Sequence, residues 1–333
     1  MGMIRMTIRR FTAAALILIF ATLLTGCNAK PTGEQDTGAI VVGFSQLGSE
    51  SAWRIGNTAS MEAAAKAHGY GLMLDNANQK QEKQISAIRS FIAYQVDVIV
   101  FSPIVEKGWD NVLTEAKNAG IPVILTDRMI DTADESLYTA YIGADFLLEG
   151  RQAGEYLIKK ADTLGKTHMN VVEISGTLNS TPMRERQQGF MQAIAGDPRF
   201  TLLESISGDF LRSRGGECMR YLLDKYGAEG IDVIYSHNDA MTLGALDVLD
   251  AAGAKPGSDD LIIISVDGEQ AAIDALKEGR VNCIVECTPD LGESVMKLVE
   301  ALSKGEAVPK SVHPEETVFT DFDDLADLPP RGY

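Results

Sequence analysis

The sequence predicts an α/β protein made of two doubly wound parallel-sheet lobes, and three observations support this. From residue 39 onward, short apolar runs alternate with longer amphipathic ones, which is the pattern of repeated β-α-β units. The apolar runs are continuous in Val, Ile and Leu, as is typical of strands covered by helices on both faces. The pattern ends near residues 143–149 and starts again, and a length of 333 residues suits two domains.

The first half contains five apolar runs, and glycines mark the ends of some amphipathic stretches. Gly69 and Gly120 each follow such a stretch, as glycine does in the left-handed position that ends a helix. The predicted strands are 39–45, 70–76, 96–102, 121–127 and 138–144. The predicted helices lie near 52–68, 79–94, 108–119 and 145–162.

The second half repeats this alternation, and no long linker precedes it. The predicted strands are 169–175, 200–207, 231–237, 261–267 and 281–287. The predicted helices lie near 183–195, 211–226, 240–252, 269–278 and 290–304.

The N-terminus has the features of an export signal. Three arginines near the start precede the apolar run 11–24, which is shorter than the roughly 20 residues of a membrane span. The following Leu-Thr-Gly-Cys resembles the bacterial lipobox, which implies a signal peptide at 1–26 and a lipid on Cys27. Residues 27–37 are then predicted to be a flexible tether. We therefore expect a protein outside the cytoplasm, held at the cell membrane by lipid; the alternative is a plain transmembrane anchor.

Charge and cysteine content exclude some classes of function. The net charge is −17 and the basic residues are not clustered, which argues against nucleic-acid binding. Beyond the export signal, Cys218, Cys283 and Cys287 are an odd number, and we expect buried free thiols. A disulfide between Cys218 and one of the others stays open. No Cys or His pair has zinc-ligand spacing, so no metal site is predicted.

Polar side chains follow most of the predicted strands. Because ligands bind beyond the carboxyl ends of strands in open parallel sheets, these side chains are candidates for one site. Carboxylates accept hydrogen bonds from adjacent hydroxyls, arginine and asparagine donate them, and a flat indole covers the apolar face of a sugar ring. The strand ends carry Gln46 to Arg54, Asn76, Gln79, Ser102, Pro103, Asp127, Arg128, Ser175, Gly208, Asp209, His237, Asn238, Asp239, Asp267, Gly268 and Glu286.

Several of these residues have a purely structural interpretation. Asp127 and Asp239 have the residue type of helix caps or turns, and Trp53 has that of a core residue of its helix. His237 is expected to orient its neighbours instead of touching a ligand. For the stretch after the strand at 231–237, we expect Asn238 to reach the ligand and Asp239 to cap the following helix.

Six motifs resemble the periplasmic sugar-binding proteins of ABC transporters, in the ribose and galactose cluster, and are most similar to the galactofuranose-binding branch. They are VVGFSQLGSESAWR at 41–54, LTDRMID at 125–131, SGDFLRSRG at 207–215, YSHNDAM at 235–241, SVDG at 265–268 and VECTPD at 285–290.

The resemblance implies the type I periplasmic-binding-protein fold, in which the chain crosses between the lobes three times and so forms a three-segment hinge. It places one lobe at 38–144 plus 287–315 and the other at 145–286 plus 316–333. The implied substrate-binding residues are Glu50, Ser51, Trp53, Arg54, Asp127, Arg128, Arg186, Asn238, Asp267 and Glu286. Ala52 stands where the family pattern has Gly, and residues 178–185 fit the pattern less well.

The resemblance also implies binding without chemistry. The protein would capture a monosaccharide as a monomer, without a cofactor, and deliver it to the membrane permease of an ABC transporter. A sugar sensor that signals to a membrane receptor or kinase is the alternative. An enzyme on the same fold is a further alternative, although Ser49 stands where a phosphate-binding loop would need Lys.

Overall fold

The computed structural model describes residues 38–333, so the predicted signal peptide, Cys27 and the tether to residue 37 lie outside the described residues. Residues Ile40–Tyr333 form one compact unit that contains two six-stranded sheets. None of the helices in the described range has the length and apolar character that crossing a membrane requires.

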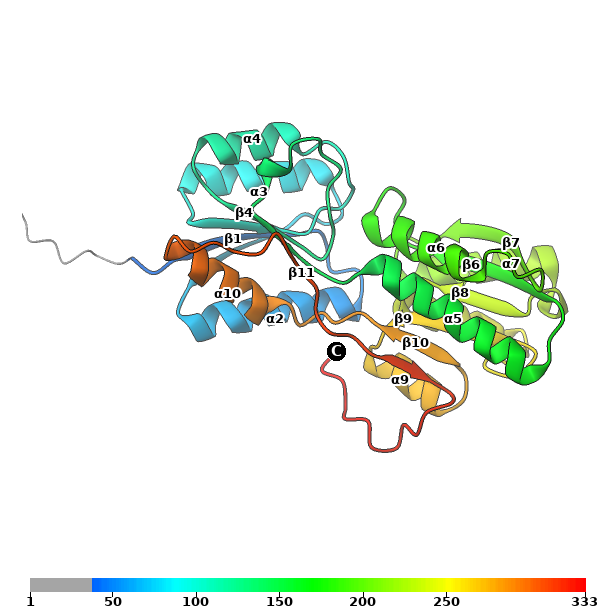
Figure 1. Ribbon diagram of the computed structural model, residues 1–333. Coiled ribbons are helices and arrows are strands. Elements are labelled where there is room, and N and C mark those ends of the chain that lie inside the picture. The colour runs from blue at the N-terminus through cyan, green and yellow to red at the C-terminus, as the bar shows by residue number, and fades with distance from the viewer. Residues whose placement is uncertain (1–37) are drawn as a thin grey trace, which may run out of the picture. The chain divides into compact units, whose positions relative to one another are not determined.

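The first sheet has the strand order β11-β5-β4-β3-β1-β2, and its neighbouring strands are parallel. Helices α2 and α10 cover one face, and α3 and α4 cover the other (Figure 1). The strands are β1 (Val41–Gln46), β2 (Gly71–Asn76), β3 (Val98–Phe101), β4 (Val123–Thr126), β5 (Ala140–Ile142) and β11 (Ser311–Val312). The helices are α2 (Ala52–His68), α3 (Gln81–Tyr94), α4 (Asp110–Asn118), the short η1 (Glu135–Leu137) and α10 (Gly292–Ser303).

The second sheet repeats this arrangement in the order β12-β10-β9-β8-β6-β7, with β12 as an antiparallel edge strand. Helices α5 and α6 pack on one face, and α7, α8 and α9 pack on the other. The strands are β6 (Met169–Ser175), β7 (Phe200–Ser207), β8 (Val233–Ser236), β9 (Ile262–Asp267), β10 (Cys283–Glu286) and β12 (Val318–Thr320). The helices are α5 (Phe146–Leu164), α6 (Thr181–Ile194), α7 (Arg212–Tyr226), η2 (Ala228–Gly230), α8 (Asp239–Ala251) and α9 (Gln270–Lys277).

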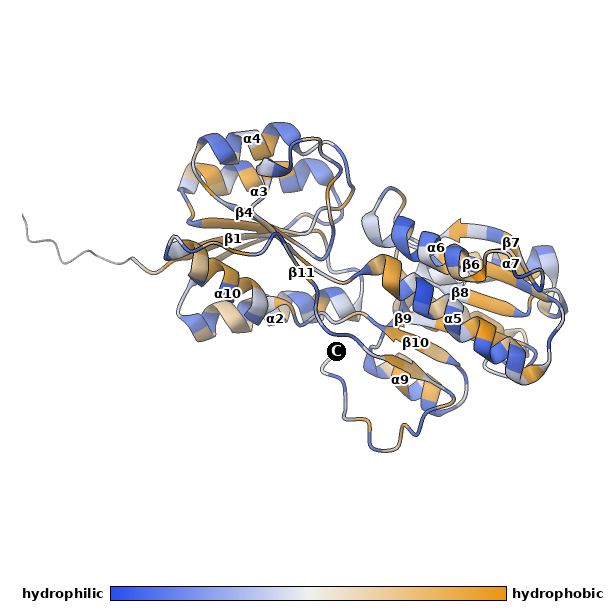
Figure 2. Ribbon diagram, viewed as in Figure 1, coloured by the Kyte–Doolittle hydropathy of each residue, from blue (hydrophilic) through white to orange (hydrophobic). Residues whose placement is uncertain are grey.

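The apolar side chains form four cores, one on each face of each sheet. The central strands are apolar along their length, whereas the helices are apolar mainly toward the sheets (Figure 2). The three described cysteines, Cys218, Cys283 and Cys287, are free and buried, which confirms that prediction and leaves the open disulfide unformed.

All the predicted strands and helices are present, with ends that differ by at most a few residues. The apolar pattern did not identify β11 and β12, because strands of two and three residues are too short to show a period. These two strands form by pairing with the edges of existing sheets.

The chain passes between the two sheets three times. The passages are the connections from β5 to β6, from β10 to β11 and from β11 to β12. This topology is the two-lobed α/β architecture that the sequence predicts; the lobe boundaries at residue level stay a prediction.

Candidate functional site

Side chains from the carboxyl ends of both sheets line one cavity with an empty volume of about 310 Å³, part of it open to solvent. Nine of the ten predicted substrate-binding residues lie here; Glu286 does not. The lining consists of Glu50, Ser51, Trp53, Arg54, Asp127, Arg128, Pro182, Arg186, Phe210, Asn238, Asp267 and Cys287.

In the first half of the cavity, Arg54 joins two carboxylates. Its Nε donates to Oε1 of Glu50 at 3.1 Å, and its Nη2 lies 2.7 Å from Oδ2 of Asp127. Burial disfavours charge on both partners, but their attraction outweighs it. The carboxylates raise the pKa of Arg54, and Arg54 with Arg128 holds the pKa of Asp127 below its usual value. The pair is therefore ionised although it is almost completely buried.

The local fold explains how these groups meet. Ser51 caps α2, because its hydroxyl accepts from the backbone N–H of Arg54, and the helix thus begins beside the end of β1. Asp127 directly follows β4 in a left-handed conformation with φ 64°, which is strained for a residue with a side chain. The hydroxyl of Tyr141 donates to the Asp127 carbonyl at 2.8 Å and holds this turn in place.

Arg186 occupies the second half of the cavity and is held from two sides. Its Nε donates to Oε2 of Glu149 at 2.7 Å, and its Nη1 donates to the carbonyl of His237 at 2.6 Å. Burial opposes the charge of Arg186, but Glu149 and other acidic neighbours raise its pKa well above the usual value. Arg186 therefore carries a positive charge at the wall of the cavity, and its contact with substrate stays a prediction.

Asp267 ends β9 in a conformation with φ 119°, so both halves of the cavity contain a strained aspartate at a strand end. Its carbonyl accepts from the N–H of Cys287 at 2.9 Å and from the hydroxyl of Tyr333 at 3.1 Å. Burial raises the pKa of Asp267 well above its usual value; Arg186 opposes this rise, and Asp239 adds to it. Asp267 thus retains a proton more readily than Asp127 does.

Asn238, not Asp239, caps α8, which corrects the expectation for this stretch. The Asn238 side-chain oxygen accepts from the backbone N–H of Met241 at 3.0 Å. Asp239 instead points toward the turn after β9, where its carboxylate accepts from the N–H groups of Gly268 and Glu269 at 2.6 and 2.7 Å. The reason is tertiary, because only the neighbouring strand brings these donors to Asp239.

Trp53 is both a core residue and part of the cavity lining, and its contact with a sugar stays a prediction. The side chain is buried in the core on the α5 side of the second sheet, and it also lines the cavity. Its Nε1 donates to the carbonyl of Cys287 at 2.6 Å, and the Arg54 guanidinium lies 4.6 Å from its ring centroid. His237 does not line the cavity; it bonds Glu173 and orients Arg186 through its carbonyl.

Phe210, Pro182 and Cys287 line the cavity although the sequence pattern did not identify them. The Phe210 ring lies 5.2 Å from the guanidinium carbon of Arg128 and 6.0 Å from that of Arg186. The sequence did contain a signal that could have identified Phe210, because this aromatic residue directly follows the strand-end pair Gly208-Asp209. Pro182 and Cys287 carried no comparable signal.

Glu286 lies outside the cavity lining at the end of β10. Its carboxylate contacts the Arg331 guanidinium and accepts from the N–H of Thr317 at 2.9 Å. These partners come from the C-terminal segment, whose position no local pattern predicts. Its predicted contact with substrate stays a prediction.

Several buried polar atoms around the cavity have no hydrogen-bond partner among the described residues. They include Oε2 of Glu50, Nη1 of Arg54 and Nε of Arg128. A buried polar atom without a partner costs about 1–3 kcal/mol. A small molecule with several hydroxyl groups has the acceptors and donors that these atoms lack.

Comparison with known proteins identifies the family. The periplasmic binding protein domain family matches residues 42–307. The galactofuranose-binding protein YtfQ of Escherichia coli is 40% identical over 274 residues, which cover 82% of this chain and 85% of that protein.

Two solved structures are similar to most of this chain. A Mycobacterium smegmatis protein in complex with β-D-fucofuranose is 45% identical, with a TM-score of 0.82 over 85% of this chain and 92% of that one. The binding protein of the arabinose ABC transporter of Shewanella sp. ANA-3, bound to α- and β-L-arabinofuranose, is 41% identical, with a TM-score of 0.81 over the same shares. By sequence and by fold, this chain belongs to the periplasmic binding protein family.

Proposed function

We propose that this protein is an extracytoplasmic solute-binding protein that captures a monosaccharide in its furanose form, galactofuranose or a related sugar. The observation that carries the proposal is the buried array of acidic and arginine side chains whose unpaired atoms converge on one cavity. The relatives support the ring form, because galactofuranose, fucofuranose and arabinofuranose appear in their names.

Each part of the array suits one part of a sugar. Asp127 and Glu50 accept hydrogen bonds from hydroxyl groups, and Arg54, Arg128 and Arg186 donate to ring and hydroxyl oxygens. The side chains of Trp53 and Phe210 provide apolar surface for the carbon atoms of the ring. The Oδ1 atom of Asn238 is occupied by the helix cap, and its NH₂ group donates to the Phe210 carbonyl at 3.4 Å, so the second N–H of that group is left for the sugar.

Capture is proposed to occur by closure of the two lobes about the three connections between the sheets. Contacts between residues at the two sheets support a closed arrangement: the Thr181 hydroxyl bonds both backbone groups of Met129 at 3.1 Å, and the N–H of Glu106 donates to the carbonyl of Asn179 at 3.0 Å. The sugar shifts the population toward this closed form and needs no energy source to do so.

The closed form then delivers its sugar to the permease of an ABC transporter, and a lipid on Cys27 keeps the protein near that partner. Dual acylation fits this role, because one acyl chain alone gives only marginal membrane binding. We infer binding without chemistry, so incubation with a bound sugar should return it unchanged.

Calorimetry against a panel of D-galactose, D-fucose, L-arabinose, D-ribose and D-fructose tests the proposal. We expect tight one-to-one binding of galactose or one of its close relatives. Carbon NMR of the bound, C1-labelled sugar then identifies the ring form, because furanose and pyranose anomeric carbons resonate at different positions. A flat response to every sugar in the panel would contradict monosaccharide capture, and a bound pyranose would contradict the ring form alone.

A further inference from the structure

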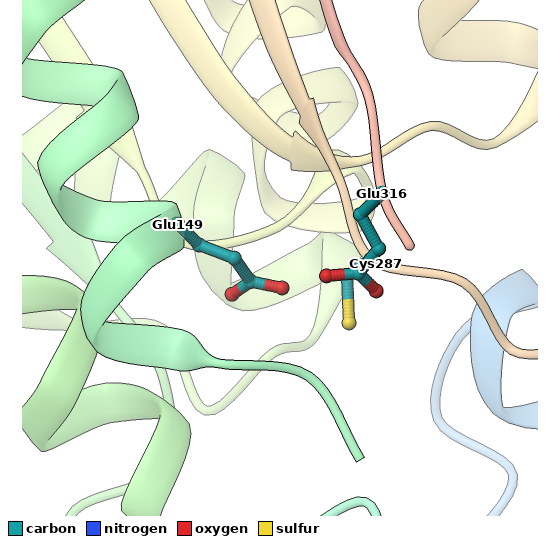
Figure 3. A group of neighbouring side chains, drawn as sticks. All are labelled: Glu149, Cys287 and Glu316. Atoms are coloured by element: carbon teal, nitrogen blue, oxygen red, sulfur yellow. The ribbon is translucent and has the colours of Figure 1, made fainter. Parts of the chain in front are cut away.

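Two carboxylates and a thiol meet where the chain passes between the sheets. The ligand atoms of Glu149, Cys287 and Glu316 all lie within 4.8 Å of one another (Figure 3). Glu149 is in the first turn of α5, on the connection from β5 to β6; Cys287 directly follows β10; and Glu316 lies between β11 and β12. Each of the three passages thus contributes one side chain to the cluster.

One oxygen of the cluster is buried without an N–H or O–H donor among the described residues. The Glu149 side chain is 2% exposed, and its Oε2 accepts from Nε of Arg186 at 2.7 Å. Its Oε1 meets no N–H or O–H donor among the described residues, and the Cys287 thiol is the donor beside this carboxylate. The Glu149 carboxylate extends from α5 toward Cys287 and Glu316 (Figure 3). An acidic oxygen in this position needs a donor or a cation.

Few protein groups around the cluster offset negative charge. Arg186 offsets Glu149, and the N–H of Thr288 donates to Oε1 of Glu316 at 2.9 Å. A bound metal ion requires all three ligands to be deprotonated, and with Arg186 beside them their net charge is then −2, which a divalent cation neutralises.

We propose that Glu149, Cys287 and Glu316 form a binding site for a thiophilic divalent cation, with Zn²⁺ as the best match. Zn²⁺ takes thiolate and carboxylate ligands in tetrahedral geometry, and three protein ligands leave a fourth position for water. Zn–S and Zn–O distances of about 2.3 and 2.1 Å place ligand atoms roughly 3.5 Å apart. Because the ligand atoms lie within 4.8 Å of one another, binding needs a contraction of at most about one ångström.

Sequence spacing does not indicate this site, because its ligands come from three separate segments. On binding, the cation replaces the proton of the Cys287 thiol, so a metal–sulfur bond forms and one proton is released to solvent for that ligand. Any carboxylic acid of the cluster that carries a proton releases it in the same way. The bound cation would connect the three passages between the sheets to one another.

Zinc titration of the purified protein, freed of metal and kept reduced, tests the site. We expect one equivalent of Zn²⁺ to bind, with a heat that differs between two buffers of unlike ionisation enthalpy, because protons are released. Co²⁺ should give a sulfur-to-metal charge-transfer absorption. Cys287→Ser should abolish that absorption and weaken zinc binding by about a hundredfold or more, as expected for loss of the strongest ligand.

Cys283→Ser is the matched control, because Cys283 is an equally buried thiol four residues away on β10 and lies outside the cluster. It should bind one zinc as the wild type does. Glu316→Gln is the second test variant if Cys287→Ser folds poorly, since Glu316 is only partly buried. The proposal is overturned if the wild type binds no zinc, or if the charge-transfer band survives in Cys287→Ser. Equal zinc affinity in Glu316→Gln and wild type would also overturn it.

Discussion

At the scale of the residue, Asp127 is the centre of the first half of the cavity. Its Oδ2 accepts from the Ser102 hydroxyl at 3.0 Å and lies 2.7 Å from Nη2 of Arg54. Arg128 Nε is 3.7 Å from the same oxygen. All these contacts involve one carboxylate oxygen, so Oδ1 is the oxygen that remains for a sugar hydroxyl.

Replacement of Asp127 by Asn should weaken sugar binding while the fold is kept. The amide has nearly the same shape but no charge, so Arg54 and Arg128 lose their common partner and a hydroxyl of the sugar loses an acceptor. We expect a loss of about 2 kcal/mol, or about 30-fold in Kd, by calorimetry. Asp131→Asn, an exposed carboxylate of the same loop, is the control and should bind as the wild type does. Equal affinities of the two variants would remove Asp127 from the site.

His237 should make the protein less stable in mild acid. Burial lowers its pKa from 6.5; Glu173 opposes this shift, and Arg186 adds to it. The folded protein therefore keeps His237 neutral, whereas the unfolded chain takes up a proton as the pH falls below 6.5. Its contribution to stability is thus present above pH 6.5 and is lost as the pH falls toward the folded pKa.

Urea unfolding at pH 7.5 and pH 5.5 measures this contribution. His237→Gln keeps a donor for Glu173 but does not titrate, so its stability should fall by about 1 kcal/mol less than that of the wild type between these pH values. His168→Gln replaces an exposed histidine and should follow the wild type. An unchanged pH dependence in His237→Gln would show that His237 does not protonate on unfolding in this range.

At the scale of the element, a glycine allows two loops of the second sheet to approach. Gly176 follows β6, and the ring of Phe210, from the loop after β7, lies directly over it, so that a Cβ at position 176 would overlap the ring. Asp209 and Phe210 both have positive φ, at 53° and 61°. The loop after β7 is therefore strained so that Phe210 can reach the cavity.

Gly176→Ala should displace the Phe210 ring and weaken sugar binding. An added methyl group in a close-packed position costs about 1–3 kcal/mol, and we expect roughly a tenfold rise in Kd together with a lower Tm. Gly230→Ala is the control, because a Cβ there meets only ordinary contact, 3.6 Å from Cβ of Tyr226. Sugar affinity in Gly176→Ala that matches the control would mean that Phe210 contributes nothing to binding.

At the scale of the whole molecule, the two sheets have corresponding strands, and two aspartates of the site lie at the ends of one such pair of strands. Asp127 follows β4, and Asp267 ends β9. Strand β4 is the third strand counted from β11 in the first sheet, and β9 is the third counted from β12 in the second. The two strained aspartates therefore occupy equivalent places. They come to a single cavity because the carboxyl ends of both sheets line it.

Two residues near the start of α6 make contacts that we expect in the closed form. The more buried contact should contribute more to sugar affinity. Thr181 is buried and bonds both backbone groups of Met129. The Arg184 side chain is 50% exposed, and its ion pair with Glu106 at 2.8 Å is screened by water. We expect Thr181→Val to weaken sugar binding about tenfold, because it leaves the Met129 groups unpaired in the closed form, and Arg184→Ala to weaken it less than about fivefold.

Calorimetry measures both affinities, and small-angle X-ray scattering with and without sugar measures compaction. The sugar-bound forms should be more compact than the free forms. A larger loss in Arg184→Ala than in Thr181→Val would reverse the assignment, and equal compactness with and without sugar would contradict closure.

The sequence by itself determined the two-lobed architecture and most of the candidate site. Continuous apolar runs and amphipathic stretches are local patterns, so the central strands and the helices could be read from them directly. Asp127, Asn238 and Asp267 could be placed as well, because a strand end is a local feature and parallel strands bring such ends to one edge. Resemblance to a family then selected Arg186, which lies within a helix and has no strand-end signal.

Tertiary structure alone decided how these groups are paired and which further residues join them. Asn238 rather than Asp239 caps α8, because the turn after β9 supplies the Asp239 carboxylate with its donors. Glu286 pairs with Arg331 and lies outside the cavity lining. Phe210 and Cys287 enter it through contacts between distant segments. Such contacts depend on how separate elements pack, and a pattern that extends over a few neighbouring residues carries no information about that.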